Sequence, residues 1–505
     1  EKQKELSKQK KELESKINIA NIGNGNVYGL HDTTSSKKTL YNIAMLPTFD
    51  KEFPKVTGVI KITNRGNGNI YGMQGKLLNN AFHDAKVWST NHNTDIITEG
   101  MIDINNEGDG DVYGMASVGN PEYDYQAFYT KSYNTYSNVW RQYSSEEPYG
   151  GDTIGRIVIH NVGDGNVYGM FSDKTTMYNT YSYSSTNAAT AYGYIDITNV
   201  GNGDVVGMCA LNGYAFNLYE SSGSYFSNYS TGTITISNHG TGNTYGLYGN
   251  SSKLYNGNQE ASSVAQIILY NKGSGNVYGI YGENNSQIYN SKGNINIHNM
   301  HDGGDAYGIY ATTGSYPYYI NNIHIDNLSS NNAVGVYSDT QNIIGGDYMN
   351  ENESYNIIIN NIGNGTAIGV YGTNIEKIQG GKIDITRLAF STNLDTYTPT
   401  DAIFGNAIGI YAQNVGLVDN DAQISIKDAD NAIGILALSN TKVTNSGTIT
   451  INNMHNSSTN SVAVGIYAGE KSTIYNTGSI NIQTNGTAYG IYAESGAIIQ
   501  NTGSI

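Results

Sequence analysis

Aspartate-containing turns are the first place in this sequence where metal chemistry can be sought. The turns read G-D-G-D, G-D-G-N or G-N-G-D, and the candidate ligands are Asp109, Asp111, Asp164 and Asp204. Calcium prefers oxygen ligands, and tandem nine-residue repeats hold it between neighbouring turns. Here the copies lie at least 25 residues apart, and most carry Asn, Ser or Thr in place of the acid. The sequence therefore predicts tight Gly/Asn turns with no metal and no other cofactor, and calcium is the weaker alternative.

Residues suited to acid–base catalysis are sparse. Cleavage of a polysaccharide needs paired carboxylates, or basic groups beside the bond that breaks. The fragments Asn93-Thr94-Asp95 and His239-Gly240 resemble parts of pectin-hydrolase motifs, but they lie in different repeats and lack a second acidic pair. The nine histidines do not have metal-ligand spacing. We predict no catalytic residues and a protein that is not an enzyme; a carbohydrate-active enzyme is the rival interpretation.

Aromatic residues gather in a long insertion between Asn120 and Tyr143, amid Ser, Asn and Asp. This composition is typical of antibody binding loops, where tyrosine gives rigid contact area and small polar residues adapt the hydrogen bonds. The alternative is that the insertion packs on the wall of its own repeat. The candidate contact residues are Tyr123, Tyr125, Phe128, Tyr129, Tyr133, Tyr136, Trp140 and Tyr143.

A repeated segment must position such insertions. An I-x-I-x-N segment is followed by a glycine turn and then by V-Y-G-[LM], as in Ile17–Leu30 and Ile60–Met73, and the core glycine recurs fourteen times. Near the C-terminus one repeat of 25 residues holds three short alternating segments bounded by Gly, Asn or Ser. This pattern predicts an all-β parallel β-helix over residues 17–505, with about 14 rungs, three strands per coil and long insertions in the N-terminal half.

Side-chain alternation assigns the faces of the repeat. The residue after the glycine is apolar in every copy and is expected inside, together with the residue before it, such as Tyr28, Val206 or Ile368. The asparagine that follows I-x-I is expected to hydrogen-bond to its counterpart one rung away. The position two after the glycine must face outward and predicts a ladder of Tyr248, Tyr281, Tyr310, Tyr337, Tyr371, Tyr411, Tyr467 and Tyr492.

The formal net charge of −16 limits the partners. Nucleic acid and anionic membrane surfaces would repel this chain, so we expect no nucleic-acid partner and membrane attachment only through regions outside it. The lone Cys209 excludes an internal disulfide. Residues 1–16 are charged, free of glycine and rich in helix formers, which predicts a short helix, a leader or a cap. Because the sequence lacks a hydrophobic leader and stops within a repeat, we expect a piece of a longer protein.

The alternation of G-I-Y-A (Gly465–Ala468) with N-T-G-S-I-N-I (Asn476–Ile482) resembles the passenger region of Gram-negative autotransporters, the type V secretion family. The resemblance covers Ile17 to Ile505 and implies a right-handed β-helix at the bacterial cell surface, anchored in the outer membrane or secreted. The family includes adhesins, autoaggregation factors, toxins and enzymes. We predict an adhesin-like stalk whose Tyr-rich loops contact a protein or glycan on a host or neighbouring cell. Self-association into aggregates or filaments is the alternative.

Overall fold

The computed structural model describes nineteen stretches of the chain, and each statement below concerns these residues. They are residues 12–32, 39–42, 55–84, 97–118, 136–142, 152–184, 190–222, 230–257, 264–291, 293–300, 302–339, 344–345, 355–362, 365–372, 375–378, 381–387, 405–413, 418–454 and 461–505. They form an all-β protein, and none of them belongs to a helix long and apolar enough to cross a membrane.

Contacts divide the chain into two compact units, residues 1–236 with 255–266, and residues 237–254 with 267–505. Each is built from parallel strands, and a strand pairs with the strand three places further along the chain, with one break in the second unit between the third strands of two successive coils. One coil therefore contains three strands, and the fold is a right-handed parallel β-helix. The described residues hold fourteen strands of the I-x-I type and fourteen of the glycine type, which confirms the predicted number of rungs.

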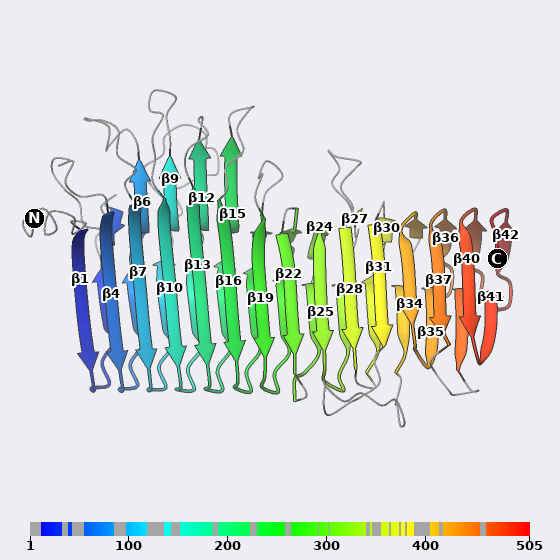
Figure 1. The fold of residues 1–505 in the computed structure, drawn as a ribbon, viewed down its shortest axis with the longest axis horizontal. Coiled ribbons are helices and arrows are strands. Elements are labelled where there is room, and N and C mark those ends of the chain that lie inside the picture. The colour runs from blue at the N-terminus through cyan, green and yellow to red at the C-terminus, as the bar shows by residue number, and fades with distance from the viewer. Residues whose placement is uncertain are drawn as a thin grey trace, which may run out of the picture. The chain divides into compact units, whose positions relative to one another are not determined.

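The first unit has three sheets, which we name the isoleucine sheet, the glycine sheet and the third sheet. The isoleucine sheet comprises β1 (Glu12–Asn21), β4 (Lys55–Asn64), β7 (Ile97–Asn106), β10 (Thr153–Asn161), β13 (Ala191–Asn199) and β16 (Thr231–Asn238). The glycine sheet comprises β2 (Val27–His31), β5 (Ile70–Gln74), β8 (Val112–Val118), β11 (Val167–Asp173) and β14 (Val205–Leu211). The third sheet comprises β3 (Thr39–Tyr41), β6 (Leu77–Asp84), β9 (Tyr136–Gln142), β12 (Thr176–Ser184) and β15 (Tyr214–Ser222). In Figure 1, strands β4, β7 and β10 lie side by side and point the same way.

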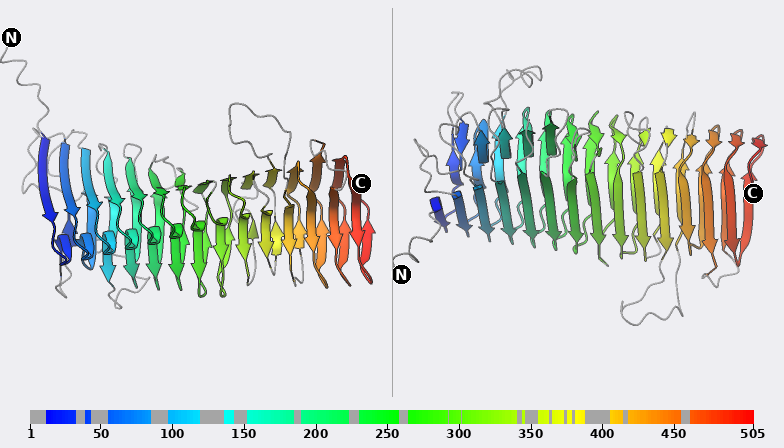
Figure 2. Two further views of the ribbon diagram at one scale, coloured as in Figure 1. Left: turned by 90° about the horizontal axis from the view of Figure 1, so that it is seen from below. Right: turned by 45° about the horizontal axis from the view of Figure 1, so that its top comes forward.

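The second unit repeats this plan. Its isoleucine sheet comprises β19 (Ala265–Asn271), β22 (Gly293–Asn299), β25 (Asn322–Asn327), β28 (Tyr355–Asn361), β31 (Gly381–Arg387), β34 (Gln423–Lys427), β37 (Thr448–Asn453) and β40 (Ser479–Thr484). Its glycine sheet comprises β17 (Thr244–Asn250), β20 (Val277–Glu283), β23 (Ala306–Ala311), β26 (Ala333–Ser338), β29 (Ala367–Gly372), β32 (Ala407–Ala412), β35 (Asn431–Ala437), β38 (Val462–Ala468) and β41 (Thr487–Ala493). Shorter strands complete each coil: β18 (Lys253–Tyr255), β21 (Gln287–Tyr289) and β24 (Tyr316–Tyr319), then β27 (Ile344–Gly345), β30 (Ile375–Ile378), β33 (Val418–Asn420), β36 (Lys442–Asn445), β39 (Thr473–Asn476) and β42 (Ile498–Asn501). Figure 2 shows these coils, coloured green to red, from two further directions.

The core is a stack of identical positions. In the isoleucine sheet Ile60 pairs in register with Ile102, and both side chains are fully buried. β1 pairs with β4 over ten residues, beginning at Glu12 opposite Lys55. The prediction of a helix or leader is therefore wrong for residues 12–16, because the neighbouring strand overrides their helix propensity; residues 1–11 lie outside the described part.

The alternation of side chains breaks at the repeated glycine. In β17, Gly246 and Leu247 are both buried, whereas Tyr245 and Tyr248 on either side are half-buried and in edge-to-face contact at 5.5 Å. A Cβ on Gly246 would lie 2.4 Å from Cγ2 of Ile267, so only glycine lets the backbone approach the facing strand. The prediction that the residue before the glycine points into the core is therefore wrong: it lies on the outer face with the residue two after the glycine. Neighbouring side chains nevertheless bury this position in some copies, such as Val206 and Val334, which are each 4% exposed.

Buried asparagine ladders connect the coils. The predicted ladder is confirmed over most of its length: the amides donate from one coil to the next, as from Asn64 to Asn106 at 2.8 Å and from Asn299 to Asn327 at 2.7 Å. It breaks between Asn238 and Asn271, because the Asn238 amide donates to the carbonyl oxygen of Gly242 and the hydroxyl of Thr244 instead. Two more ladders were not predicted from the sequence. One follows the third sheet of the first unit through Asn42, Asn80, Asn138, Asn179, Asn217 and Asn256, and the other joins Asn420, Asn445, Asn476 and Asn501. Because burying an amide without a partner is costly, the ladders lock the register of neighbouring coils.

Candidate ligand-binding groove

The tyrosines two residues after the glycine form a stacked column on the outer face of the glycine sheet in the second unit. From Tyr248 to Tyr411 the ring centroids of successive members lie 5.5, 5.2, 4.4, 4.7 and 4.8 Å apart. Leu436 occupies the next position, and beyond it Tyr467 stacks on Tyr492 at 5.2 Å. We call this column the outer tyrosine column. Since adjacent rings cover one another, the column presents ring edges and hydroxyl groups.

A second column lies beside it, at the position before the glycine. Its first members are Tyr245, Tyr278 and Tyr307, which stack on one another and pack edge-to-face against the outer tyrosine column. From β26 to β38 the same position holds smaller aliphatic residues, and tyrosine returns only in β41 with Tyr489. The aliphatic residues are Val334, Ile368, Ile408, Ile433 and Val464, of which the first four line the groove described next.

This change of side-chain size creates a groove. The loss of the phenol rings lowers the surface over four successive coils and leaves a groove of about 570 Å³. Tyr337, Tyr371 and Tyr411 form one wall, and Tyr307 lines the groove where the tyrosines of the second column end. The floor is the aliphatic row, in which Ile368 and Ile433 are half-buried while Val334 and Ile408 are only 4% and 9% exposed. The opposite wall consists of Asn332, Thr366, Asn406 and Asn431.

Hydrogen bonds between coils hold the amide wall in place. The side-chain oxygen of Asn332 accepts the backbone N–H of Thr366 at 2.9 Å, and Asn431 donates to Asn406 at 2.8 Å. On the facing wall the Tyr371 hydroxyl donates to Oε1 of Gln413 at 2.6 Å. These bonds fix one polar group per coil on each side of the aliphatic floor.

The groove itself is uncharged, but carboxylates lie near it. Burial, followed by the neighbouring Tyr310 and Asp339, raises the pKa of Tyr337 to about 12, and burial also raises the pKa of Tyr371. Both phenols are therefore neutral at physiological pH. Asp305 accepts the backbone N–H of Asn332 at 2.8 Å, and Asp430 immediately precedes Asn431.

The predicted aromatic loop is only partly within the described residues. Tyr123, Tyr125, Phe128, Tyr129, Tyr133 and Tyr143 lie outside them, as does the side chain of Trp140. Tyr136 lies in β9, is 1% exposed and donates from its hydroxyl to the carbonyl oxygen of Met115 at 2.8 Å. The prediction that Tyr136 is a contact residue is wrong, because in the third sheet its side chain points into the core.

The aspartates of the glycine turns serve the backbone. Oδ1 of Asp111 accepts the N–H of Asn166 at 2.8 Å, and Oδ1 of Asp164 accepts the N–H of Asn202 at 3.0 Å. Within the described ranges, no group of three or more His, Cys, Asp or Glu side chains is arranged to hold a metal ion. The turn carboxylates thus do the same work as the asparagines at equivalent positions, such as Asn69, which accepts the N–H of Asp111.

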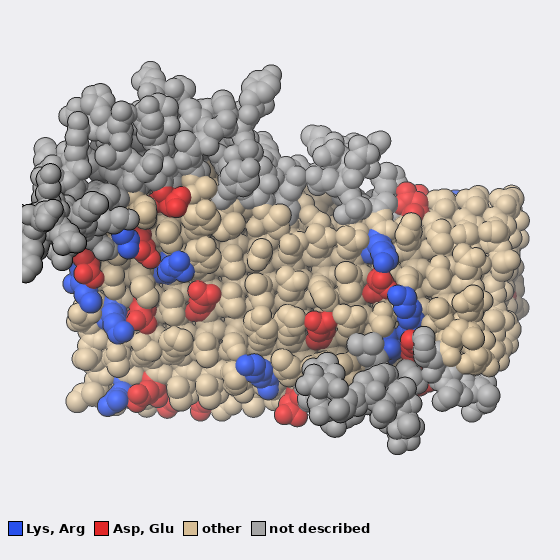
Figure 3. All heavy atoms as spheres, in the orientation of Figure 1, with Lys and Arg blue, Asp and Glu red and all other residues tan. Residues whose placement is uncertain are grey.

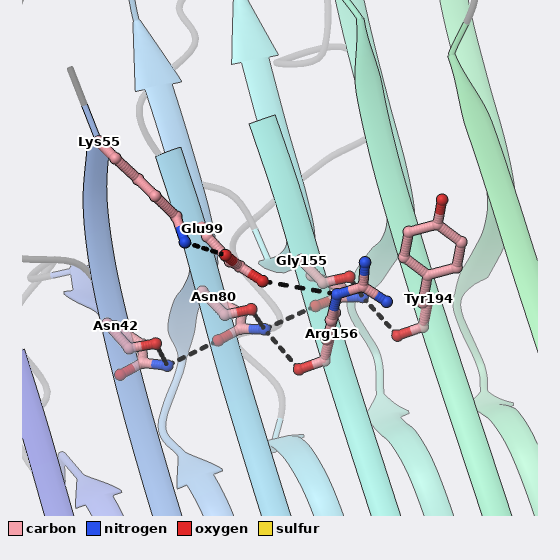
Figure 4. A network of polar contacts seen from close by, with 10 residues as sticks. Asn42, Lys55, Asn80, Glu99, Gly155, Arg156 and Tyr194 are labelled. Atoms are coloured by element: carbon pink, nitrogen blue, oxygen red, sulfur yellow. Dashed lines mark hydrogen bonds and ion pairs between the residues drawn. The ribbon is translucent and has the colours of Figure 1, made fainter. Parts of the chain in front are cut away.

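A charged network covers part of the isoleucine sheet of the first unit (Figure 4). Glu99 lies 3.0 Å from Lys55 and 3.5 Å from Arg156, whose guanidinium sits 4.6 Å above the ring of Tyr194. Beneath it, the Asn80 amide donates to the carbonyl oxygen of Arg156 at 3.1 Å. In Figure 3, positive and negative side chains near β1, β4 and β7 lie next to one another. The opposite charges of this network pair with one another, so we assign it to contacts between neighbouring coils of the β-helix and not to ligand binding.

Comparison with known proteins supports the fold. Residues 257–505, just under half of the chain, match the family model described as the BigA third pectate lyase-like domain. This is a similarity to a β-helix domain and covers most of the second unit, including every residue that lines the groove. Comparison with curated proteins and with solved structures gave no significant match.

The groove was not predicted from the sequence, although its signal is present. The residue before the repeated glycine changes from Tyr307 to Val334, and aliphatic residues follow in the next four copies. This change in side-chain size predicts a depression only if the residue before the glycine is known to face outward. Strict alternation of side chains had placed that residue inside.

Proposed function

We propose that this chain is an adhesin-like protein of the bacterial surface, of the autotransporter passenger type, and that it binds its partner in the groove of the second unit. The groove is the observation that carries the proposal. It is a concave, aliphatic surface between two rows of ordered polar groups, the combination found in ligand sites. The match to a β-helix domain and the resemblance to passenger regions support a location at the bacterial surface.

The chemistry of the lining favours binding over catalysis. A general base must be able to accept a proton near the working pH, but phenols with raised pKa values, amides and alkyl groups do not. We therefore propose a site that recognises a ligand without transforming it.

The experiment fills the groove with a side chain that the fold already accepts. Ile368→Tyr combined with Ile408→Tyr places tyrosine where Tyr307 stands in an earlier coil, so the β-helix should be preserved. Val206→Tyr introduces tyrosine at the same repeat position in the first unit, next to Tyr168, and is the matched control.

Purified wild-type and variant proteins are compared for binding to cultured epithelial cells and for thermal unfolding. We expect the double variant to lose at least about tenfold in binding with little change in melting temperature, and the control to bind like wild type. Wild-type binding by a folded double variant would refute the proposal.

Self-association is the second candidate, because the outer tyrosine column is a continuous aromatic strip from Tyr248 to Tyr411. Two copies could pack along this strip, although Glu283, which accepts the Tyr248 hydroxyl at 2.6 Å, adds negative charge at one end. Replacing Tyr281, Tyr310 and Tyr337 by Ser should then abolish the sedimentation of cells that display the protein. Unchanged clumping would reject this candidate.

A further inference from the structure

We infer that the occupant of the groove is an extended, uncharged glycan chain that lies along the β-helix axis, and that acidic polysaccharides are excluded. This inference rests on the proposed function, because it names the class of ligand for the same site. It follows from the direction of the groove, from the groups in its walls and from the charges around it.

The groove runs across the strands, from coil to coil. Its lining residues come from β23, β26, β29, β32 and β35 and from the residues just before these strands. A peptide that adds to a β-sheet must run parallel to the strands and pair with an edge, so this site cannot bind a peptide by strand addition. The four aliphatic floor positions span roughly 14 Å, at about 4.8 Å per coil, which suits a short stretch of an extended chain.

The two walls present hydrogen-bonding groups at the same interval. Amides at Asn332, Asn406 and Asn431 face the hydroxyl edge formed by Tyr337, Tyr371 and Tyr411. Amide and hydroxyl groups both donate and accept, as sugar hydroxyls do. A glycan carries such hydroxyls along both edges of the chain and can therefore satisfy both walls in every coil.

The floor receives the apolar face of the sugar. Aromatic ring faces are the usual platform for sugars, but in this column neighbouring rings cover them, at centroid distances of 4.4 to 4.8 Å. The aliphatic row of Val334, Ile368, Ile408 and Ile433 takes this role instead. The C–H groups of a sugar ring would displace water from these side chains, which is favourable.

Charge excludes uronate-containing polymers. The residues that line the groove include no Lys, Arg or His, whereas the Asp305 carboxylate accepts the backbone N–H of Asn332 in the amide wall. Asp430, which precedes Asn431, adds little negative charge because the Arg387 guanidinium interacts with it. Asp339 lies close enough to Tyr337 to raise the pKa of its phenol. A polymer with one carboxylate per sugar would meet these negative charges without a compensating cation, so the similarity to a pectate lyase-like domain does not extend to an acidic ligand here.

The test measures binding of defined oligosaccharides to the intact chain by isothermal titration calorimetry. Neutral probes are cellohexaose, maltohexaose, a β-1,4-galactan hexasaccharide and mannohexaose, and the acidic probe is hexagalacturonate. We expect at least one neutral probe to bind, with a change below about twofold between low and high salt, because no charge pairs form. Ile368→Tyr with Ile408→Tyr should weaken that binding at least tenfold, and Val206→Tyr should not.

The outcomes separate this inference from the proposed function. Binding of hexagalacturonate in preference to every neutral probe would overturn the inference. A second outcome would also overturn it: the groove-filling variant loses cell adhesion, but no neutral oligosaccharide binds the wild-type protein or competes with cells for it. The partner would then be a protein. If the folded variant adhered to cells like wild type, the proposed function itself would fail.

Discussion

Asn299 offers the sharpest test of how the coils are held together. Its amide nitrogen donates to the carbonyl oxygen of Gly304 at 2.6 Å and to Asn327 at 2.7 Å, and its oxygen accepts a hydrogen bond from the Asn271 amide at 2.8 Å. Asn299→Ala removes these three bonds, together with a longer contact of the same nitrogen to the Ser329 hydroxyl at 3.2 Å, from a fully buried position. At about 1 kcal/mol for each hydrogen bond, the loss in unfolding free energy should be roughly 3 kcal/mol. The loss becomes larger if the buried groups that bonded to Asn299 are left without a new partner.

The assay has a global and a local part. Urea unfolding followed by circular dichroism gives the change in stability, and amide hydrogen exchange with mass spectrometry shows whether protection falls first in β22 and β25. The control is Asn105→Ala: this half-buried asparagine faces outward and makes one 3.2 Å bond to Asp103, so it should cost less than about 1 kcal/mol. If both substitutions had the same small effect, the ladder would not stabilise the stack as argued.

Three further predictions follow from other positions. Gly308→Ala should destabilise by about 1–3 kcal/mol in urea, because the new Cβ would lie 2.4 Å from a methyl carbon of Ile323, while Gly25→Ala, with nothing within 4 Å, should be neutral. Because burial raises the pKa of Tyr337 to about 12, this phenol keeps its proton in the folded protein at pH values where the unfolded chain has lost it, near pH 10. The melting temperature should therefore decrease as the pH rises from about 10 to 12, and phenolate absorbance should show tyrosines that titrate late. An unperturbed titration would contradict the burial of the column. Cys209 is buried with its pKa raised to about 12, so Ellman's reagent at pH 8 should label it only in urea; rapid labelling of the folded protein would be incompatible with this site.

The features that recur with fixed spacing could be predicted from sequence. The I-x-I pattern and the asparagine after it identified the inner face, the register and one buried ladder, because side chains in a parallel stack repeat from coil to coil. The ladder through Asn80 was missed because its distance from the repeated glycine varies from copy to copy. The ladder through Asn445 keeps a constant distance and was missed because its strands are very short, as in Val418–Asn420 and Lys442–Asn445.

The groove was beyond the reach of pattern alone. Its position depends on the break in alternation at glycines such as Gly335, and this break comes from close contact with a facing strand that the sequence does not reveal. Composition also misplaced Tyr136 in a surface loop, whereas its side chain fills the core from β9. In both cases the missing information is which segments face one another across the coil.

The asparagine ladder has a consequence for how such a chain can change. Partners in the ladder are separated by 43 residues between Asn21 and Asn64, by 55 between Asn106 and Asn161, and by 28 between Asn271 and Asn299. The hydrogen bond between the two side-chain amides is nevertheless 2.7 or 2.8 Å long in each case. The number of residues in one coil therefore does not affect how neighbouring coils pack. New segments can be gained or lost in one coil while the adjacent ones remain unaltered, which makes the fold a scaffold on which surface loops can diversify independently.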